Sequence, residues 1–328
     1  AIGKDALTAN TTGLLNTAVG RLALSGNTTA SYNVAVGEGA LEANTTGALN
    51  TAIGRGALQA NTTANDNTAV GAWALLANTT GLYNVGIGVS ALRNATTADG
   101  NTALGFHAAR QITTGYNNVA IGYAALVSNS TGNNNVAIGN NSLDANTASY
   151  NTAIGYNALT DNTTGANNTA VGNGSQENTS TGSNNVSIGA GSLNANTTGS
   201  NNTAVGRSAL GANTTGDQSV AVGSNALDAN TTGRINVAVG HNAGKETQGE
   251  ESVAIGVFSG LNFQGTNSIA IGKDSAKNNQ SGSSVAIGSA AATNQGVKES
   301  SVSTSHPVGS FVDTLDAEVH EIKIGTQI

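Results

Sequence analysis

Apolar and polar residues alternate in a short phrase that returns along most of the chain. In the copy Asn67-Thr68-Ala69-Val70-Gly71, Thr68 and Val70 fall on one face of an extended strand and Ala69 falls on the other. Across the copies the second position is Thr, Val or Ile and the fourth is Val, Ile or Leu, residues that suit a pleated, buried surface. We therefore expect one short strand in each copy, with its β-branched side chains in the core.

The copies follow one another at an almost fixed interval. Their closing glycine recurs every seventeen residues from Gly3 to Gly139 and, after one step of sixteen, every seventeen from Gly155 to Gly240. Three further steps of sixteen end at Gly288. Such regular self-similarity predicts a stack of like units in which each unit contacts only its neighbours.

The rest of each unit predicts corners rather than helices. A Leu, such as Leu75, usually follows the glycine by four positions, and we expect it to point inward from a second short strand or a bend. Turn residues follow, as in Asn78-Thr79-Thr80-Gly81, because Asn forms local side-chain turns and Gly accepts positive φ. The predicted fold is an all-β β-solenoid, a flattened parallel roll of about 18 coils with a period of 16–17 residues.

The third position of the phrase is almost always Ala, with Gly86 and Ser187 as equally small exceptions. Constant smallness indicates that another backbone packs closely against this face. The neighbour is either the opposite wall of the same roll or another subunit, and we favour another subunit. The predicted subunit interface therefore contains Ala35, Ala52, Ala69, Ala103, Ala120 and Ala137.

The copies at 252–256 (Ser-Val-Ala-Ile-Gly), 268–272 (Ser-Ile-Ala-Ile-Gly) and 284–288 (Ser-Val-Ala-Ile-Gly) resemble the YadA-like head repeats of trimeric autotransporter adhesins. The resemblance covers about residues 1–290 and implies a left-handed parallel β-roll with three chains around a common axis. The longer coil with Asn-Thr-Thr-Gly is similar to repeats of bacteriophage tail-fibre proteins and of large bacterial surface proteins.

The phrase stops at Gly288, which divides the chain into a repetitive roll, residues 1–288, and a linker with a C-terminal capping or connecting segment, residues 289–328. Pro307, the only proline, marks the break, and residues 318–325 alternate as a β-segment would. We expect this short β cap to close the open end of the stack. Because the chain lacks Met and opens inside the phrase, we expect it to be a piece of a longer protein.

Composition excludes several classes of partner. A formal net charge of -7 without a cluster of Lys or Arg argues against nucleic acid. Cysteine is absent, which leaves neither disulfides nor thiolate metal ligands. No apolar run approaches a membrane span, so we expect no membrane insertion.

Candidate chemistry is sparse, and we expect no enzyme activity, no cofactor and no metal site. None of the four histidines, His107, His241, His306 and His320, has a spaced Asp or Ser partner. Calcium-binding β-rolls carry Gly-Gly-x-Gly-x-Asp repeats, whereas Asp144, Asp161 and Asp228 are single turn acids. The repeated Asn-Thr-Thr matches the glycosylation sequon, but in-register Asn and Thr ladders are the favoured interpretation. Ice binding by the Thr ladders is a minor alternative.

Aromatic residues interrupt the repeat and either contact a sugar or protein partner or cover a corner or a subunit seam. The candidate surface contacts are Tyr32, Trp73, Tyr83, Tyr116, Tyr123, Tyr150 and Tyr156. The hypothesis that follows is an extracellular homotrimeric fibre, the rigid shaft or head of a phage tail fibre that attaches to a host-surface glycan or protein receptor. A bacterial cell-surface trimeric adhesin head is the alternative, and a glycan-processing β-helix module is the minor one, with no paired carboxylates to support it.

Overall fold

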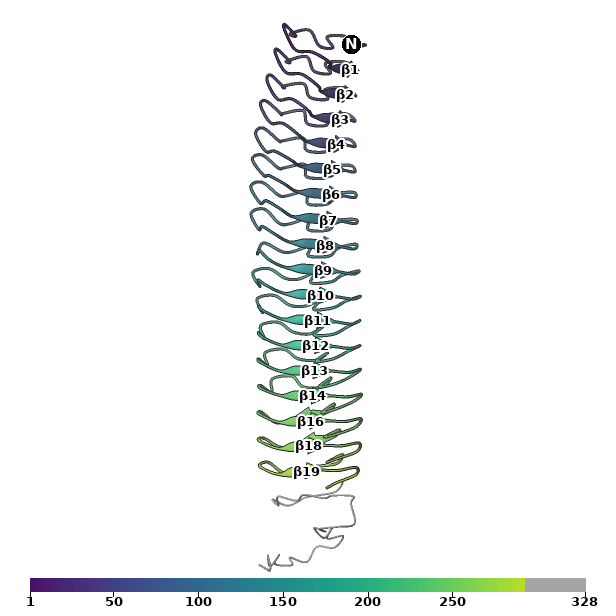
Figure 1. Cartoon of the computed structure of the whole chain (residues 1–328), viewed down its shortest axis with the longest axis vertical. Coiled ribbons are helices and arrows are strands. Elements are labelled where there is room, and N and C mark those ends of the chain that lie inside the picture. Colours follow the sequence, from purple (N-terminus) through teal and green to yellow (C-terminus); the bar gives the residue numbers. More distant parts are fainter. Residues whose placement is uncertain (293–328) are drawn as a thin grey trace, which may run out of the picture.

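The chain forms one elongated β-solenoid in a computed structural model that describes residues 1–292 (Figure 1). Each coil contributes one short strand to a parallel sheet that runs the length of the rod, and turns complete the rest of the coil. No helix occurs within residues 1–292. The predicted all-β parallel solenoid is therefore confirmed for this part of the chain.

Seventeen three-residue strands make up the long sheet, and a separate pair makes up a second, small one. The long sheet contains β1 (Thr17–Val19), β2 (Val34–Val36), β3 (Thr51–Ile53), β4 (Thr68–Val70), β5 (Val85–Ile87), β6 (Thr102–Leu104), β7 (Val119–Ile121), β8 (Val136–Ile138), β9 (Thr152–Ile154), β10 (Thr169–Val171), β11 (Val186–Ile188), β12 (Thr203–Val205), β13 (Val220–Val222), β14 (Val237–Val239), β16 (Val253–Ile255), β18 (Ile269–Ile271) and β19 (Val285–Ile287). The small sheet pairs β15 (Thr247–Gln248) with β17 (Phe263–Gln264).

Adjacent coils pair in the register that the period predicts. Thr17 of β1 lies opposite Val34 of β2, and Ala18 lies opposite Ala35. Where the interval falls to sixteen residues, the register persists, with Val136 of β8 opposite Thr152 of β9. The missing residue comes from the turn, because the Asn146 side chain donates to the carbonyl two residues ahead, at Ala148, whereas Asn44 donates to the carbonyl three residues ahead, at Gly47. The strands thus keep one ladder while the turns absorb the change in length.

The Leu that most coils carry four residues after the repeat glycine lies in a bend and not in a second strand. Leu75 adopts a left-handed backbone with φ of +50°, and its side chain is fully buried. Its amide donates to the carbonyl of Ala91 in the next coil at 3.0 Å, and its own carbonyl accepts from Asn78 at 3.1 Å. These bonds, repeated at Leu24, Leu41 and Leu58, stabilise a conformation that Leu rarely adopts.

The structure reverses the predicted orientation of the strand. The third-position alanines point into the coil of their own chain, where they and the turn leucines form the core. The expected subunit interface is therefore wrong, because these side chains are 0% exposed in the single chain: Ala35, Ala52, Ala69, Ala103, Ala120 and Ala137. The opposite wall of the same roll is the close neighbour, since a β-carbon at Gly86 would lie 3.4 Å from Leu75 Cγ. The Thr, Val and Ile side chains predicted for the core face outward.

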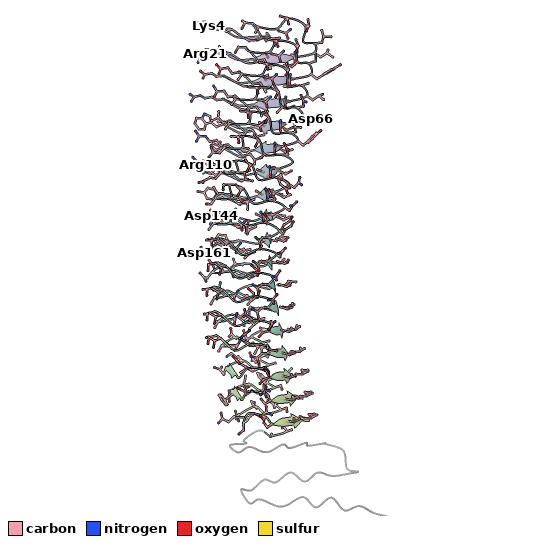
Figure 2. All side chains as sticks on the ribbon, turned by 90° about the vertical axis from the view of Figure 1, so that its left-hand side faces the viewer. Lys4, Arg21, Asp66, Arg110, Asp144 and Asp161 are labelled. Atoms are coloured by element: carbon pink, nitrogen blue, oxygen red, sulfur yellow. The ribbon has the colours of Figure 1, made fainter. Side chains whose placement is uncertain are left out.

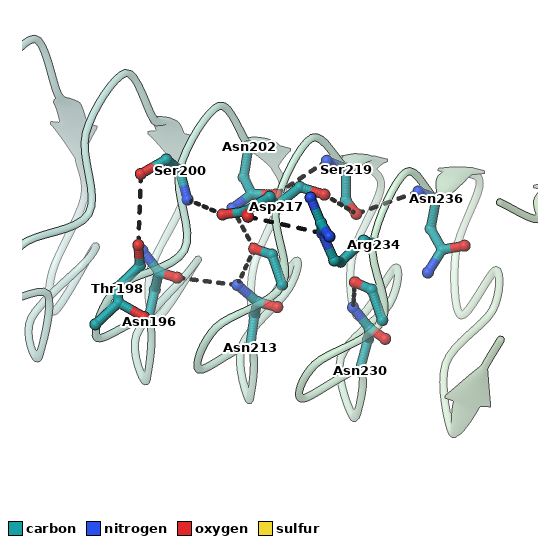
Figure 3. A network of polar contacts seen from close by, with 12 residues as sticks. Asn196, Thr198, Ser200, Asn202, Asn213, Asp217, Ser219, Asn230, Arg234 and Asn236 are labelled. Atoms are coloured by element: carbon teal, nitrogen blue, oxygen red, sulfur yellow. Dashed lines mark hydrogen bonds and ion pairs between the residues drawn. The ribbon is translucent and has the colours of Figure 1, made fainter. Parts of the chain in front are cut away.

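Two ladders of buried asparagine run along the rod, as the sequence predicts for in-register Asn (Figure 3). In the turn ladder, the side-chain amide of Asn213 donates to Asn196 Oδ1 at 2.9 Å. In the ladder before the strands, Asn202 Oδ1 accepts from the backbone of Ser219 at 2.9 Å, and Ser219 Oγ accepts from the backbone of Asn236 at 3.2 Å. The turn asparagines bond to a carbonyl of their own turn, as Asn213 does to Gly216, and the ladder before the strands bonds to backbone amides of the neighbouring coil, which removes the cost of leaving these buried groups unpaired.

The last coils replace Leu by Gln in the interior. Gly260 and Ala276 occupy the Leu position, and the space is filled by Gln264 and Gln280. Gln264 Nε2 donates to the carbonyls of Val253 and Ser268 at 2.8 and 3.0 Å. The repetitive roll continues through Gly288, whereas most of the cap predicted for 289–328 lies outside the described residues.

Candidate functional site

The outward face of the long sheet carries a column of exposed apolar side chains that runs along the described part of the chain. The fourth-position side chains that stand out from it are between 37% and 45% exposed: Ile53, Ile87, Leu104, Ile154, Ile188, Val222, Val239, Ile255 and Ile287. Beside them stand the second-position Thr, Val and Ile residues, most of them half-buried. Because the strands repeat in strict parallel register, these side chains form two continuous columns along the rod. We call this surface the outward sheet face.

Two edges flank this sheet face, and the candidate aromatic residues divide between them. On the edge that precedes the strands, which we call the pre-strand edge, lie Tyr32, Tyr83, Tyr116 and Tyr150. On the edge that follows the repeat glycines, which we call the glycine edge, lie Trp73, Tyr123 and Tyr156. All seven are exposed in the single chain. Figure 2 shows the two edges on opposite sides of the rod, with Asp66 on the pre-strand edge and Arg21, Arg110 and Asp144 on the glycine edge.

On the glycine edge, Trp73 lies between two guanidinium groups from neighbouring coils. The Cζ atoms of Arg55 and Arg93 lie 5.7 and 5.8 Å from its ring centroid. Such contacts contribute about 0.5–1 kcal/mol each at exposed sites. Trp73 also holds φ of +60°, at a coil position that glycine occupies in the two preceding coils as Gly39 and Gly56.

The next coils of this edge continue the same mixture of rings and cations. Phe106 stacks on His107 with ring centroids 3.8 Å apart and on Tyr123 at 5.5 Å. Burial lowers the pKa of His107, and the charges of Arg110 and Arg93 lower it further. We call the surface of Arg55, Trp73, Arg93, Phe106, His107 and Arg110 the cation–aromatic strip.

The arginines of this strip differ in their partners. Arg55 Nε lies 3.8 Å from Glu38 Oε2, whereas Arg93 and Arg110 are in no ion pair with any residue of the described part of the chain. Arg110 Nε is buried and has no hydrogen-bond partner there. The sequence analysis did not identify this cluster, because its arginines stand apart in the chain and form no run of basic residues. Arg93 and Arg110 are seventeen residues apart, so the repeat itself places them in adjacent coils.

Acidic groups lie on the glycine edge at both ends of the strip. Toward the N-terminus, Glu38 accepts from Arg21 Nε at 3.2 Å, and this hydrogen bond and the arginine charge lower the pKa of Glu38. Toward the C-terminus, burial raises the pKa of Asp144, and the neighbouring charge of Asp161 raises it further. Burial likewise raises the pKa of Asp228 in a later coil. The strip is therefore a local positive region on an acidic chain.

The remaining candidate groups show no catalytic arrangement. His241 contacts Asn242 and the edge of Phe258, while His306 and His320 lie outside the described residues. Within residues 1–292, no group of three His, Cys, Asp or Glu side chains could hold a metal ion, and no helix would reach across a lipid bilayer. A shallow cavity of about 280 Å³ lies where the coil shortens, beside the buried, unpartnered amide of Gln248.

The sequon asparagines of the turns do not present their amides to solvent. Asn78 is fully buried, and its Nδ2 donates to Asn61 Oδ1 and to the Gly81 carbonyl, both at 3.0 Å. A glycan on this nitrogen would have to displace the ladder. Comparison of the sequence with models of known protein families and with curated proteins finds no match.

Proposed function

We propose that this chain is a non-enzymatic structural fibre protein, the rigid shaft or head of an extracellular appendage that holds attachment surfaces away from its base. The observation that carries the proposal is the outward sheet face, an apolar surface continuous through all seventeen strands of a rod that already has its own core. At about 4.8 Å per strand, the sheet extends roughly 80 Å. A surface of this length and uniformity suits other copies of the same rod better than a small ligand.

The proposed assembly is a homotrimer with its three-fold axis parallel to the rods. Rotation about such an axis brings like coils together at every level, so one repeated pattern serves the entire interface. It also places all N-termini at one end, as a shaft with a tip requires. A phage tail fibre that mediates host-surface attachment is the first assignment, and a bacterial trimeric adhesin head is the alternative with the same geometry.

A pair of charge variants tests the assembly. Replacing Ile87 and Leu104 by Lys puts two charges on the outward sheet face in adjacent coils, at side chains that are 37% and 45% exposed. The matched control carries Thr80→Lys and Thr97→Lys, also in adjacent coils but at exposed turn positions. We expect folded monomers from the first variant and trimers from the second, measured by sedimentation velocity with circular dichroism as the check on folding. Equal particle masses for the two would contradict the proposal.

A further inference from the structure

We propose that the cation–aromatic strip binds an acidic polysaccharide, laid along the rod, through carboxylate or phosphate groups on its sugars. The inference deepens the proposed attachment role and rests on it, because it names the partner of one edge of the fibre. It concerns the glycine edge and leaves the outward sheet face free for assembly.

Charge gives the first part of the argument. Arg93 and Arg110 come from adjacent coils, where two like charges repel, and neither has an acidic partner in the described part of the chain. Between residues 55 and 123 the only acids are Asp66 and Asp99. Asp66 lies on the opposite side of the rod (Figure 2), and the carboxylate of Asp99 accepts from the backbone of Leu82 on that pre-strand edge. A planar guanidinium matches the paired oxygens of a carboxylate or phosphate, and a bound anion would relieve the repulsion.

Backbone strain gives the second part. Trp73 and His107 adopt φ of +60° and +58° at a coil position that Gly, Asn or Ser occupies in most other coils. Bulky side chains in this region cost about 1–3 kcal/mol, and at the turn leucines, which also have positive φ, burial in the core offsets this cost. Trp73 is not among the buried core residues, since 36% of it remains exposed and its ring packs between Arg55 and Arg93. Its presence is better explained by a contact outside the chain than by packing.

Ring geometry favours a sugar chain over nucleic acid. Phe106 is stacked on His107 and Tyr123, and Trp73 has arginines near its ring, so few open ring faces remain for successive bases. Ring edges and partly open faces can still pack against the C–H groups of sugars. The acids at both ends of the strip oppose a long, densely charged strand, whereas a polysaccharide with sparse charges fits the short positive region.

Binding to the full chain tests the proposal with polygalacturonate as the carboxylated probe and phosphomannan as the phosphorylated one. The test variant is Arg93→Gln with Arg110→Gln, and its control is Arg207→Gln with Lys273→Gln, which makes the same change in net charge on the same edge outside the strip. We expect one or both probes to bind, with about a tenfold loss of affinity in the test variant and less than a twofold loss in the control. Neutral dextran should not bind.

Two further readouts separate binding from a structural effect. Trp73→Gly removes the ring at a position where Gly39 and Gly56 show that glycine fits, so it should weaken binding without lowering stability. In the unmodified chain, NMR titration should show the pKa of His107 rising when the probe binds, because a bound anion opposes the effect of Arg93 and Arg110.

Equal affinity of the test and control variants, or no binding of either acidic probe, would overturn the proposal. Tighter binding of a single-stranded oligonucleotide than of both acidic sugars would assign the strip to nucleic acid and also overturn it. Particle mass is measured on the same samples. Loss of sugar binding with the trimer intact would exclude this inference alone, and a monomer that still binds sugar would exclude the proposed assembly alone.

Discussion

Gly71 approaches the carbonyl group of Gly88 in the next coil so closely that a β-carbon at position 71 would lie 2.6 Å from that oxygen. Its φ of +130° lies in a region that essentially only glycine occupies. The same relationship recurs at the closing glycine of every coil from Gly3 to Gly272. The recurrent glycine is therefore required by the stacking of the coils.

A substitution at this glycine should be much more damaging than one at other glycines. We expect Gly71→Ala to lower the free energy of unfolding by at least about 3 kcal/mol, because strain and a backbone clash add together. The control is Gly191→Asn, since a β-carbon there meets nothing closer than 3.8 Å and its φ of +65° is one that Asn tolerates. Denaturant unfolding measures the free energy of unfolding of both variants. Similar losses of stability in the two would contradict the role given to the repeat glycine.

The alanine ladder should resist enlargement even in an isolated chain. Ala69→Leu forces extra volume between the strand and the turn leucines and should cost about 1–3 kcal/mol. Asn78→Ala should cost less, because Ala95 already occupies the next position of that ladder and leaves Asn78 Oδ1 without a partner. The melting temperatures of the two variants, measured by thermal unfolding, rank their stabilities. An Ala69→Leu variant as stable as the unmodified chain would show that the alanines are not closely packed.

The asparagine before each strand should be harder to replace than the turn asparagine. Asn84 Nδ2 donates to the Ala98 carbonyl at 2.6 Å, and its Oδ1 accepts from the backbone of Asn101 at 3.0 Å. Asn84→Ala leaves these buried groups unpaired, at about 1–3 kcal/mol for each group. Asn84→Ser should retain more stability, since Ser219 accepts a backbone hydrogen bond at the equivalent position. Denaturant unfolding should show a smaller loss of stability for Asn84→Ser than for Asn84→Ala. Equal losses would contradict the role of the ladder in pairing buried backbone groups.

The stability of the glycine edge should depend on pH at Asp144. Because its pKa is raised in the folded chain, the folded state holds this proton more tightly than the unfolded state does. Its contribution to stability therefore falls as the pH rises from the ordinary carboxyl range through the raised pKa. Asp144→Asn should stabilise the fold at pH 7 and have less effect near pH 3. Asp161→Asn should lower the pKa of Asp144, as NMR titration of the carboxyl group would show, and an unchanged pKa would contradict the coupling.

Periodicity predicts the solenoid, the register and the asparagine ladders because each is a property of the repeat rather than of one coil. It does not predict which strand face is inside. The alternation of Thr68, Ala69 and Val70 fits either orientation, and hydrophobicity alone favours the larger side chains. The coil is narrow, however, and with a turn leucine such as Leu75 opposite the strand there is room only for a methyl group. The cation–aromatic strip was also missed, because its residues are adjacent only across coils.

The mass of the unmodified chain in solution tests the central claim most directly. If the outward sheet face joins copies into a trimeric fibre, sedimentation equilibrium at micromolar concentration should give three times the chain mass of 32.2 kDa. A single species of 32.2 kDa at all concentrations would show that this face has no partner of its own kind and would contradict the account.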